Sequence, residues 1–140
     1  MHEHNLLNME QYPLKVLVAF AESFSERSKF HDWLLKHGYP ELAALSSAIR
    51  GSEPAFVWLM KNQYYHYAAL DGAIDKQLKA RVWLSRHEYP LLGALADAVN
   101  ENKQAIAWLD ANGFQVMLFI AQKIRTFRDS QVFDYHKMHF

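Results

Sequence analysis

The chain has 140 residues, 51% of them hydrophobic and 14% aromatic, which is enough apolar material for one packed domain and argues against a disordered chain. Lys and Arg together number 15, as do Asp and Glu, and this balance excludes an overall field that would draw the chain to nucleic acid or to an anionic bilayer. The absence of cysteine excludes disulfides, thiolate nucleophiles and cysteine-held metal sites.

The N-terminal segment carries no targeting signal. MHEHNLLNMEQ has acids and no cationic stretch, and the apolar PLKVLVAFA after it is interrupted by Lys15. No uncharged apolar run approaches the ~20 residues that span a bilayer. The sequence therefore predicts a cytoplasmic protein with no membrane segment. His2 and His4 at this end, and His136 and His139 at the other, could order around zinc, but we expect solvated, frayed termini and no metal site.

Residues 14–38 are the first predicted structural unit. Leu17, Phe20 and Phe24 stand at i, i+3 and i+7, which is the spacing of one face of an α-helix. The polar stretch SFSERSKFHD follows them. This unit keeps the register of the later ones loosely, as is typical of a terminal repeat with a polar outer face.

A regular period runs through the rest of the chain. The four tryptophans are separated by a constant interval of twenty-five positions, a leucine follows each of them, and an aromatic residue recurs six positions after each. This tryptophan interval divides a single domain, residues 1–140, into units at about 14–38, 39–63, 64–88, 89–113 and 114–140. The three columns are Trp33, Trp58, Trp83 and Trp108; Leu34, Leu59, Leu84 and Leu109; and Tyr39, Tyr64, Tyr89 and Phe114.

Each unit is predicted to hold two short helices. In the second unit, the apolar spacing and the helix-breaking residues place these helices at roughly 40–50 and 53–61, and the division recurs in the next units. Proline is favoured in the first turn of a helix, and glycine in the left-handed position after its end. The residues that mark helix ends in this way are Pro40 and Pro90, Gly38 and Gly113, and the pair Gly51-Ser52.

Helices this short must pack against one another, because isolated helices below ~12–15 residues are marginal in water. We expect the Trp, Leu and Ile columns to be buried between successive units. The predicted fold is therefore all-α, a right-handed type of α–α superhelix (α-solenoid) of about four to five helical-hairpin repeats with atypical terminal caps. The C-terminal RTFRDSQVFDYHKMHF is expected to form an amphipathic closing helix, whose VFDY and MHF segments are candidates for self-association.

One repeat pattern is similar to that of a known class. The pattern YP-x-L-x-x-L-x-x-A-[IV] followed by A-x-x-W-L, as in Tyr89 to Val99 and Ala105 to Leu109, resembles the leucine-rich repeat variant, a class of short all-helical repeats. The unit of that class is about one residue shorter and usually has Asp after its Leu-Ala. This chain has alanine there, at Ala48, Ala73 and Ala98. The resemblance implies a helical-repeat architecture and carries no functional residue.

None of the familiar catalytic motifs occurs. The chain has no G-x-S-x-G, no Walker loop, no G-x-G-x-x-G and no H-E-x-x-H. Asp71 and Asp75 stand at i and i+4 and could act as an acid–base pair, but we expect a solvated pair near a helix end. The sequence thus predicts no catalytic residue and no cofactor.

The remaining candidate site is a polar edge beside the tryptophans. Three of the tryptophans are followed, three positions later, by a cation, and His or Asn follows each cation. In a solenoid these positions form two parallel rows that could contact a partner. The structural alternative is that they serve only helix C-termini, where cations and capping residues are favoured. The predicted edge comprises Lys36, His37, Lys61, Asn62, Arg86 and His87.

The sequence favours a non-enzymatic helical-repeat module that binds another protein, because the periodic positions serve packing and leave the variable surface for recognition. The alternative is a nucleic-acid-binding or regulatory protein that uses Lys36, Lys61 and Arg86 on phosphates. A second alternative is an enzyme whose site spans several units and has no signature in the sequence.

Overall fold

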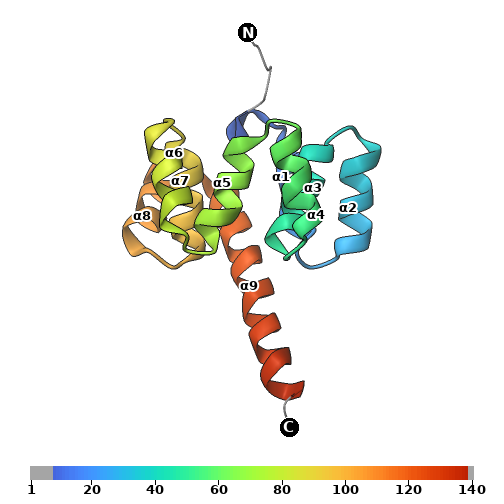
Figure 1. Ribbon diagram of the computed structural model, residues 1–140. Coiled ribbons are helices and arrows are strands. Elements are labelled where there is room, and N and C mark those ends of the chain that lie inside the picture. Colours follow the sequence, from blue (N-terminus) through green and yellow to red (C-terminus); the bar gives the residue numbers. More distant parts are fainter. Residues whose placement is uncertain (1–7, 139–140) are drawn as a thin grey trace.

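The computed structural model describes the backbone of residues 8–138 and the side chains of residues 8–131. Within this part of the chain every regular element is a helix (Figure 1). The predicted all-α class is therefore confirmed. The elements are η1 (Met9–Gln11), a 3₁₀ helix, and the α-helices α1 (Leu14–Glu22), α2 (Arg27–Lys36), α3 (Pro40–Ile49), α4 (Glu53–Lys61), α5 (Tyr65–Ile74), α6 (Leu78–Arg86), α7 (Pro90–Val99), α8 (Lys103–Ala111) and α9 (Gln115–Met138).

The helices follow the tryptophan interval read from the sequence. The starts of α3, α5, α7 and α9 are separated by that same interval, and so are the starts of α4, α6 and α8. α3 and α4 lie within a residue of the predicted helices, and Pro40 and Pro90 are the first residues of their helices, as expected. We call the first helix of each unit an inner helix (α1, α3, α5, α7 and α9) and the second an outer helix (α2, α4, α6 and α8).

A left-handed residue ends each outer helix and turns the chain back toward the next inner helix. After α2, Gly38 has a φ of 88°. The next residue, Tyr39, donates its backbone N–H to the carbonyl of Leu34 at 2.8 Å, which closes the helix end. Gly113 has a φ of 76° at the equivalent position after α8. The predicted roles of both glycines are confirmed.

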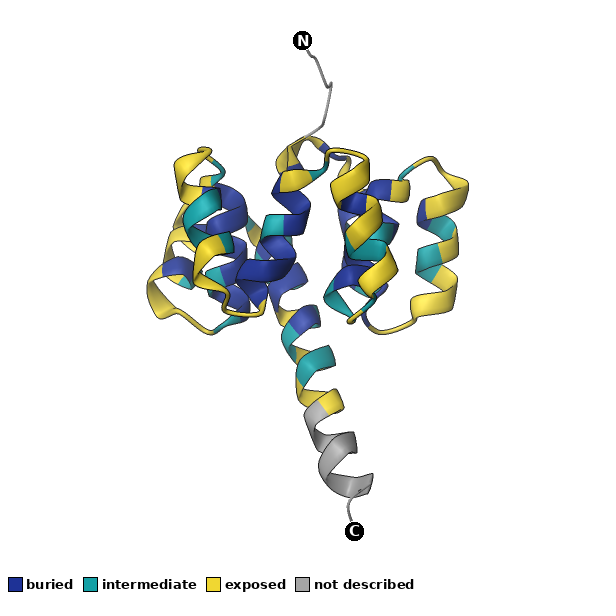
Figure 2. Ribbon diagram, in the orientation of Figure 1, coloured by how far each residue is buried: buried dark blue, intermediate teal, exposed yellow. Residues whose placement is uncertain are grey.

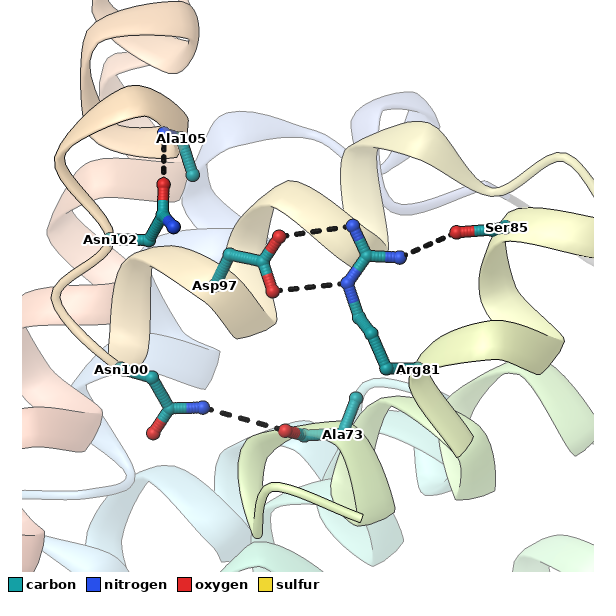
Figure 3. Close-up of polar contacts among 7 residues, drawn as sticks. All are labelled: Ala73, Arg81, Ser85, Asp97, Asn100, Asn102 and Ala105. Carbon is teal, nitrogen blue, oxygen red and sulfur yellow. Dashed lines mark hydrogen bonds and ion pairs between the residues drawn. The ribbon is translucent and has the colours of Figure 1, made fainter. Parts of the chain in front are cut away.

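The inner helices α3, α5 and α7 also end at a left-handed residue, and a polar side chain caps the start of the outer helices α4 and α8. Gly51 has a φ of 106° after α3, and the Ser52 hydroxyl accepts the backbone N–H of Ala55 at 3.2 Å. Asn102 caps α8 through the N–H of Ala105 at 2.9 Å (Figure 3). The Gly51-Ser52 prediction is confirmed.

The inner helices form a closed series. Each inner helix packs against the next one along the chain, and the last, α9, packs against the first, α1. The outer helices lie on the outside of this layer (Figure 1). Pairwise stacking of helical hairpins is therefore present, whereas a superhelix with two separate ends is not established by this arrangement.

Charged and aromatic contacts join α9 to the N-terminal unit. The Lys123 ammonium lies 2.9 Å from the Glu22 carboxylate. The Phe127 ring lies 6.2 Å from the ring of Phe24, and the guanidinium of Arg50 lies 4.5 Å from the centroid of Phe127. Because these residues are far apart in sequence, the interface brings the two ends of the domain together.

α9 is one continuous helix, whereas each of the other units consists of two helices. The break in earlier units falls at Gly51, Lys76 and Glu101, which all have positive φ. In α9 the equivalent residue is Thr126. A positive φ is strongly unfavourable for a β-branched residue such as threonine. Phe127 stands at the position where a polar residue caps the outer helix in other units, so the helix continues through this point. The predicted closing helix is confirmed, while the side chains of VFDY and MHF lie outside the described residues.

The leucine that follows each tryptophan holds the outer helices on the inner layer. Leu34, Leu59, Leu84 and Leu109 all have 0% exposure, whereas Trp58 and Trp108 are 36% and 42% exposed and Trp33 and Trp83 are half-buried. The expectation that the tryptophans are buried is therefore wrong for Trp58 and Trp108, while Trp33 and Trp83 are partly buried against the core. Neighbouring residues on a helix point ~100° apart, so when leucine faces inward the tryptophan lies at the side of the helix. Figure 2 shows the buried surface concentrated on the inner helices.

The segment before α1 covers one end of the inner layer. Met9 occupies the position equivalent to the buried leucines and is 1% exposed. The Tyr12 hydroxyl donates to the buried carboxylate of Glu41 at 2.6 Å. The hydroxyl of Tyr67 donates in turn to the Tyr12 oxygen at 3.4 Å. These contacts satisfy polar groups that the apolar surroundings would otherwise leave without partners.

A second set of contacts joins the C-terminal ends of neighbouring inner helices. Arg50, Asn100 and Arg125 occupy equivalent positions. Arg50 donates to the carbonyls of residues 23 and 24, Asn100 to those of 73 and 74, and Arg125 to that of 98. Figure 3 shows the contact of Asn100. Asp75 holds the equivalent position after α5, and a carboxylate cannot donate such a bond.

None of the helices in the described part of the chain combines the length and hydropathy that a bilayer crossing requires.

Glycine at the left-handed position after α4 should stabilise the protein. Gln63 has a φ of 68° there, a conformation that costs a non-glycine residue ~1 kcal/mol or more. We expect Gln63→Gly to raise the free energy of unfolding by about 1 kcal/mol, measured by urea denaturation. Gly38→Ala should lower it by a similar amount, because a Cβ there meets no atom within 4 Å and only backbone strain is added. Changes of the same sign in the two variants would contradict this assignment.

Asp75→Asn should restore the missing contact between inner helices. The new amide can donate to the carbonyls of residues 48 and 49, as Asn100 does one unit later. We expect a gain of about 1 kcal/mol in the free energy of unfolding, which is typical of one added hydrogen bond. Asp75→Ala supplies no donor and serves as the matched control, so an equal gain in both variants would assign the effect to loss of charge.

Candidate binding surface

The three cations of the predicted edge lie at the ends of outer helices. Lys36, Lys61 and Arg86 are the last residues of α2, α4 and α6, and all three are exposed. These helix ends lie along the upper edge of the molecule in Figure 1. In the described part of the chain none of the three has an ion-pair partner. Their charge is therefore available to a partner.

The other three residues of the edge are occupied in capping their own helices. The Nδ1 atom of His37 donates to the carbonyl of Trp33 at 2.8 Å, and His87 donates to Trp83 at 2.9 Å. Asn62 donates its side-chain amide to the carbonyl of Trp58 at 2.8 Å. Each of these carbonyls also accepts the backbone N–H of the same residue, so the side chain adds a second hydrogen bond at the helix end. The structure thus divides the predicted edge into free cations and capping residues.

Aromatic stacking surrounds the half-exposed tryptophans. The rings of His37 and His87 stack on Trp33 and Trp83, with centroids 4.1 and 3.9 Å apart. The Trp83 ring also stacks on that of Tyr89 at 5.8 Å, and the same contact recurs in the neighbouring units. The tryptophans therefore form flat apolar surfaces beside the cations.

A groove runs between the outer helices α4 and α6. Its floor is the inner helix α5, and its volume is about 550 Å³. Apolar side chains provide most of its lining, with three polar residues at its margins. The lining residues are Phe56, Met60, Tyr65, Ala68, Ala69, Gln77, Lys79, Ala80, Trp83 and His87.

An equivalent groove of about 860 Å³ lies one unit further on, between α6 and α8 over α7. Its lining is more polar. The Arg81 guanidinium donates two hydrogen bonds, each 3.0 Å long, to the two carboxylate oxygens of Asp97 and a third to Ser85 at 2.7 Å (Figure 3). A planar two-point pair of this kind fixes both side chains in orientation. The side chains of Arg81, Ser85 and Asp97 in this groove are therefore already paired within the chain.

Asp71 is buried, contrary to the prediction of a solvated residue. It lies on the buried face of α5, in the column of Ser46 and Ala96, and is 9% exposed. Burial, with a smaller effect from the charge of Asp75, raises the pKa of Asp71 to about 7. Asp75 is exposed, as expected. Asp71 can therefore be protonated near neutral pH.

Asp71, Asp75 and Glu53 line a pocket of about 390 Å³. Among the residues that the structure describes, however, no group of three or more His, Asp or Glu side chains has an arrangement that could hold a metal ion. The histidine pairs noted near the chain ends lie outside the residues whose side chains are described. The pocket therefore offers no positive sign of a metal centre.

His66 is a buried titratable group that was not predicted as a candidate from the sequence. It is 3% exposed, and burial lowers its pKa to about 4, so the ring is neutral at neutral pH. Its ring lies 4.1 Å from that of Tyr67 and 5.1 Å from that of Tyr89. No described side chain forms a hydrogen bond to it, so the structure gives it no partner for acid–base chemistry.

The sequence contained a signal for some of these residues. Asp71 and His66 stand in columns that are apolar in the later units, although Ser46 and Glu41 hold the same positions in the second unit, and a polar residue in such a column indicates a buried polar group. The pairing of Arg81 with Asp97 had no such signal, because both residues lie at positions that vary between units.

No known protein-family model matches this chain, and no curated protein and no solved structure shows significant similarity to it.

Asp71 should make the protein less stable as the pH rises. Its folded-state pKa of about 7 lies above its ordinary value of 3.8, so between these values the folded state binds more protons and the free energy of unfolding falls with increasing pH. We expect Asp71→Ala to be more stable than the native chain by at least ~1 kcal/mol at pH 8, since one pKa unit corresponds to 1.36 kcal/mol. Urea unfolding at several pH values measures this difference.

The comparison with Asp71→Ala isolates this one group. His66 has the opposite dependence, because its folded-state pKa is lowered and its contribution is lost as the pH falls from 6.5 toward about 4. It is present in both proteins, so its effect cancels in the difference. The advantage of Asp71→Ala should shrink as the pH approaches 5, and a difference that does not change with pH would contradict the assignment.

Proposed function

We propose that the chain is a non-enzymatic helical-repeat module that binds another protein. In this proposal its hairpins, repeated at the tryptophan interval, stack as the four to five units of an α-solenoid-like array, and a surface that crosses several units forms the binding site. The observation that carries the proposal is the row of Lys36, Lys61 and Arg86, which are exposed at equivalent helix ends and lack ion-pair partners in the described part of the chain.

The contrast between residues used in packing or capping and cations used in neither supports this function. The periodic residues are used in packing: the four leucines are buried, and His37, Asn62 and His87 cap helices. The cations beside them are not required by these contacts. Cations of this kind, next to half-exposed tryptophan rings, suit a protein partner that offers carboxylates together with apolar side chains.

Nucleic acid is the second candidate partner, because the same three cations could contact phosphates. The chain as a whole has equal numbers of basic and acidic residues, so no long-range attraction would support such binding. Three phosphate contacts alone would also give weak binding that falls with salt. A protein partner is therefore favoured.

Reversal of the three charges should abolish capture of the partner. The triple variant Lys36→Glu, Lys61→Glu, Arg86→Glu leaves the buried contacts intact, and we expect it to fold with native circular dichroism. Proteins that bind the native chain in lysate from the source cell, identified by quantitative mass spectrometry, should be depleted at least tenfold, because carboxylates of the partner would then face like charges.

The matched control reverses three exposed cations elsewhere on the outer helices and their loops, at Lys29, Lys76 and Lys103. It has the same net charge as the triple variant and should capture the partner normally. Equal capture by all three proteins would exclude the edge as the binding site. Tight binding of a single-stranded oligonucleotide that weakens steeply from about 50 to 200 mM salt would instead favour nucleic acid.

A further inference from the structure

The groove between α4 and α6, called here the α4–α6 groove, exposes large apolar side chains that the fold does not require. Met60 is 42% exposed and Tyr65 is 46% exposed. At the equivalent positions of the next unit stand Ser85 and Pro90, and the helices there have the same relative bounds. Since the same hairpin forms with either set of residues, the apolar residues of the α4–α6 groove are not explained by folding.

The groove is deep enough to accept a large side chain. Its floor and one side are formed by Ala68, Ala69 and Ala80. Phe56 from α4 and Trp83 from α6 form its apolar walls. Small residues below and aromatic residues at the sides leave a volume of about 550 Å³. This combination is typical of a pocket that receives an apolar anchor from a partner.

Positive charge borders the same groove. Lys79 lines it directly. Lys61 and Arg86 do not line it: Lys61 is the residue after Met60 at the end of α4, and Arg86 lines an adjoining hollow together with Lys79 and Trp83. All three cations are exposed, and none has an ion-pair partner in the described part of the chain. A partner that covered this border without offering carboxylates would leave these cations partly desolvated and unpaired, which is unfavourable.

The neighbouring groove keeps Ala94, Ala105 and Trp108 at the equivalent positions but differs in the other residues. Arg81 replaces Phe56 and is paired with Asp97, and Gln104 replaces Lys79. Ser85, in the place of Met60, accepts a hydrogen bond from Arg81. These three polar side chains are paired with one another, and the large apolar residues are fewer. The two grooves are therefore formed by the same arrangement of helices, but the residues that line them differ in chemistry.

We propose that the α4–α6 groove binds an acidic segment of a partner protein, which inserts a large aliphatic or aromatic side chain between Met60 and Trp83 and places carboxylates near Lys61, Lys79 and Arg86. This inference rests on the proposed protein-binding function and identifies the chemistry of the partner. Pocket-filling anchors give the affinity of such complexes, and the charges at the border give orientation and rate of association.

A displayed library of random peptides, selected against the full-length chain, tests the groove directly. The enriched peptides should carry a Trp, Phe, Leu or Met next to Asp or Glu. Their binding, measured by fluorescence anisotropy with the synthetic peptides, should weaken at least roughly tenfold on Met60→Ser, because the anchor then has no apolar side chain to pack against. Lys61→Glu combined with Lys79→Glu should weaken it by a similar factor.

The neighbouring groove supplies the control. Met60→Ser introduces the residue that the chain itself uses one unit later, so the helix is expected to fold normally. Ser85→Met makes the reverse change in the neighbouring groove and should leave peptide binding unchanged. Circular dichroism and thermal unfolding of each variant establish that the fold is retained.

Three results with the peptides would each overturn the proposal: no binder is enriched, the enriched peptides lack acidic residues, or they bind Met60→Ser as well as the native chain. A change of molecular mass on Met60→Ser in light scattering would identify a second copy of this chain as the occupant, which also overturns it. Lys61 and Arg86 belong both to this site and to the edge of Lys36, Lys61 and Arg86, so Met60→Ser, which leaves every edge residue unchanged, is the variant that distinguishes the groove from the capture of partner proteins by the edge. That capture can survive loss of the groove, and its failure would instead reject the proposed function.

Discussion

The fold depends on one buried leucine in each outer helix. Outer helices of nine or ten residues have little stability of their own, and each is fixed on the inner layer by Leu34, Leu59, Leu84 or Leu109, all of which have no exposed surface. The left-handed residue that follows each outer helix then directs the chain into the next inner helix. One apolar contact and one turn, repeated at a fixed interval, generate the successive hairpins.

Contact between the two ends of the domain adds a constraint that the repeat does not contain. α9 has no outer helix and packs instead against α1 and its neighbours. Thr126 and Phe127 make this possible, since neither can form the turn that divides the other units. The inner layer therefore begins and ends at the same interface, and the ion pair of Lys123 with Glu22 lies across it.

Comparison of units within one chain separates residues that serve folding from residues that serve recognition. The leucine that recurs after each tryptophan is buried, and the His or Asn that follows each outer helix caps it. Positions that vary, such as Met60 and Ser85 or Phe56 and Arg81, line the grooves between outer helices. Because the backbone is the same in both settings, this variation changes the chemistry of a surface without changing its framework. The chain can thus present one largely apolar groove beside a more polar groove that contains the pair of Arg81 and Asp97.

The sequence by itself determined the helical class, the interval at which the hairpins repeat, and the helix ends at Gly38, Gly51 and Pro90, because helical periodicity and turn chemistry are local properties. It also placed the edge residues at helix C-termini, but it could not separate the capping His37 from the free Lys36. Only the tertiary structure decided that α1 meets α9, that the tryptophans stay half-exposed, and that Asp71 is buried while Arg81 pairs with Asp97. These features depend on which helices become neighbours and how each is rotated, and residues many positions apart in the chain set both.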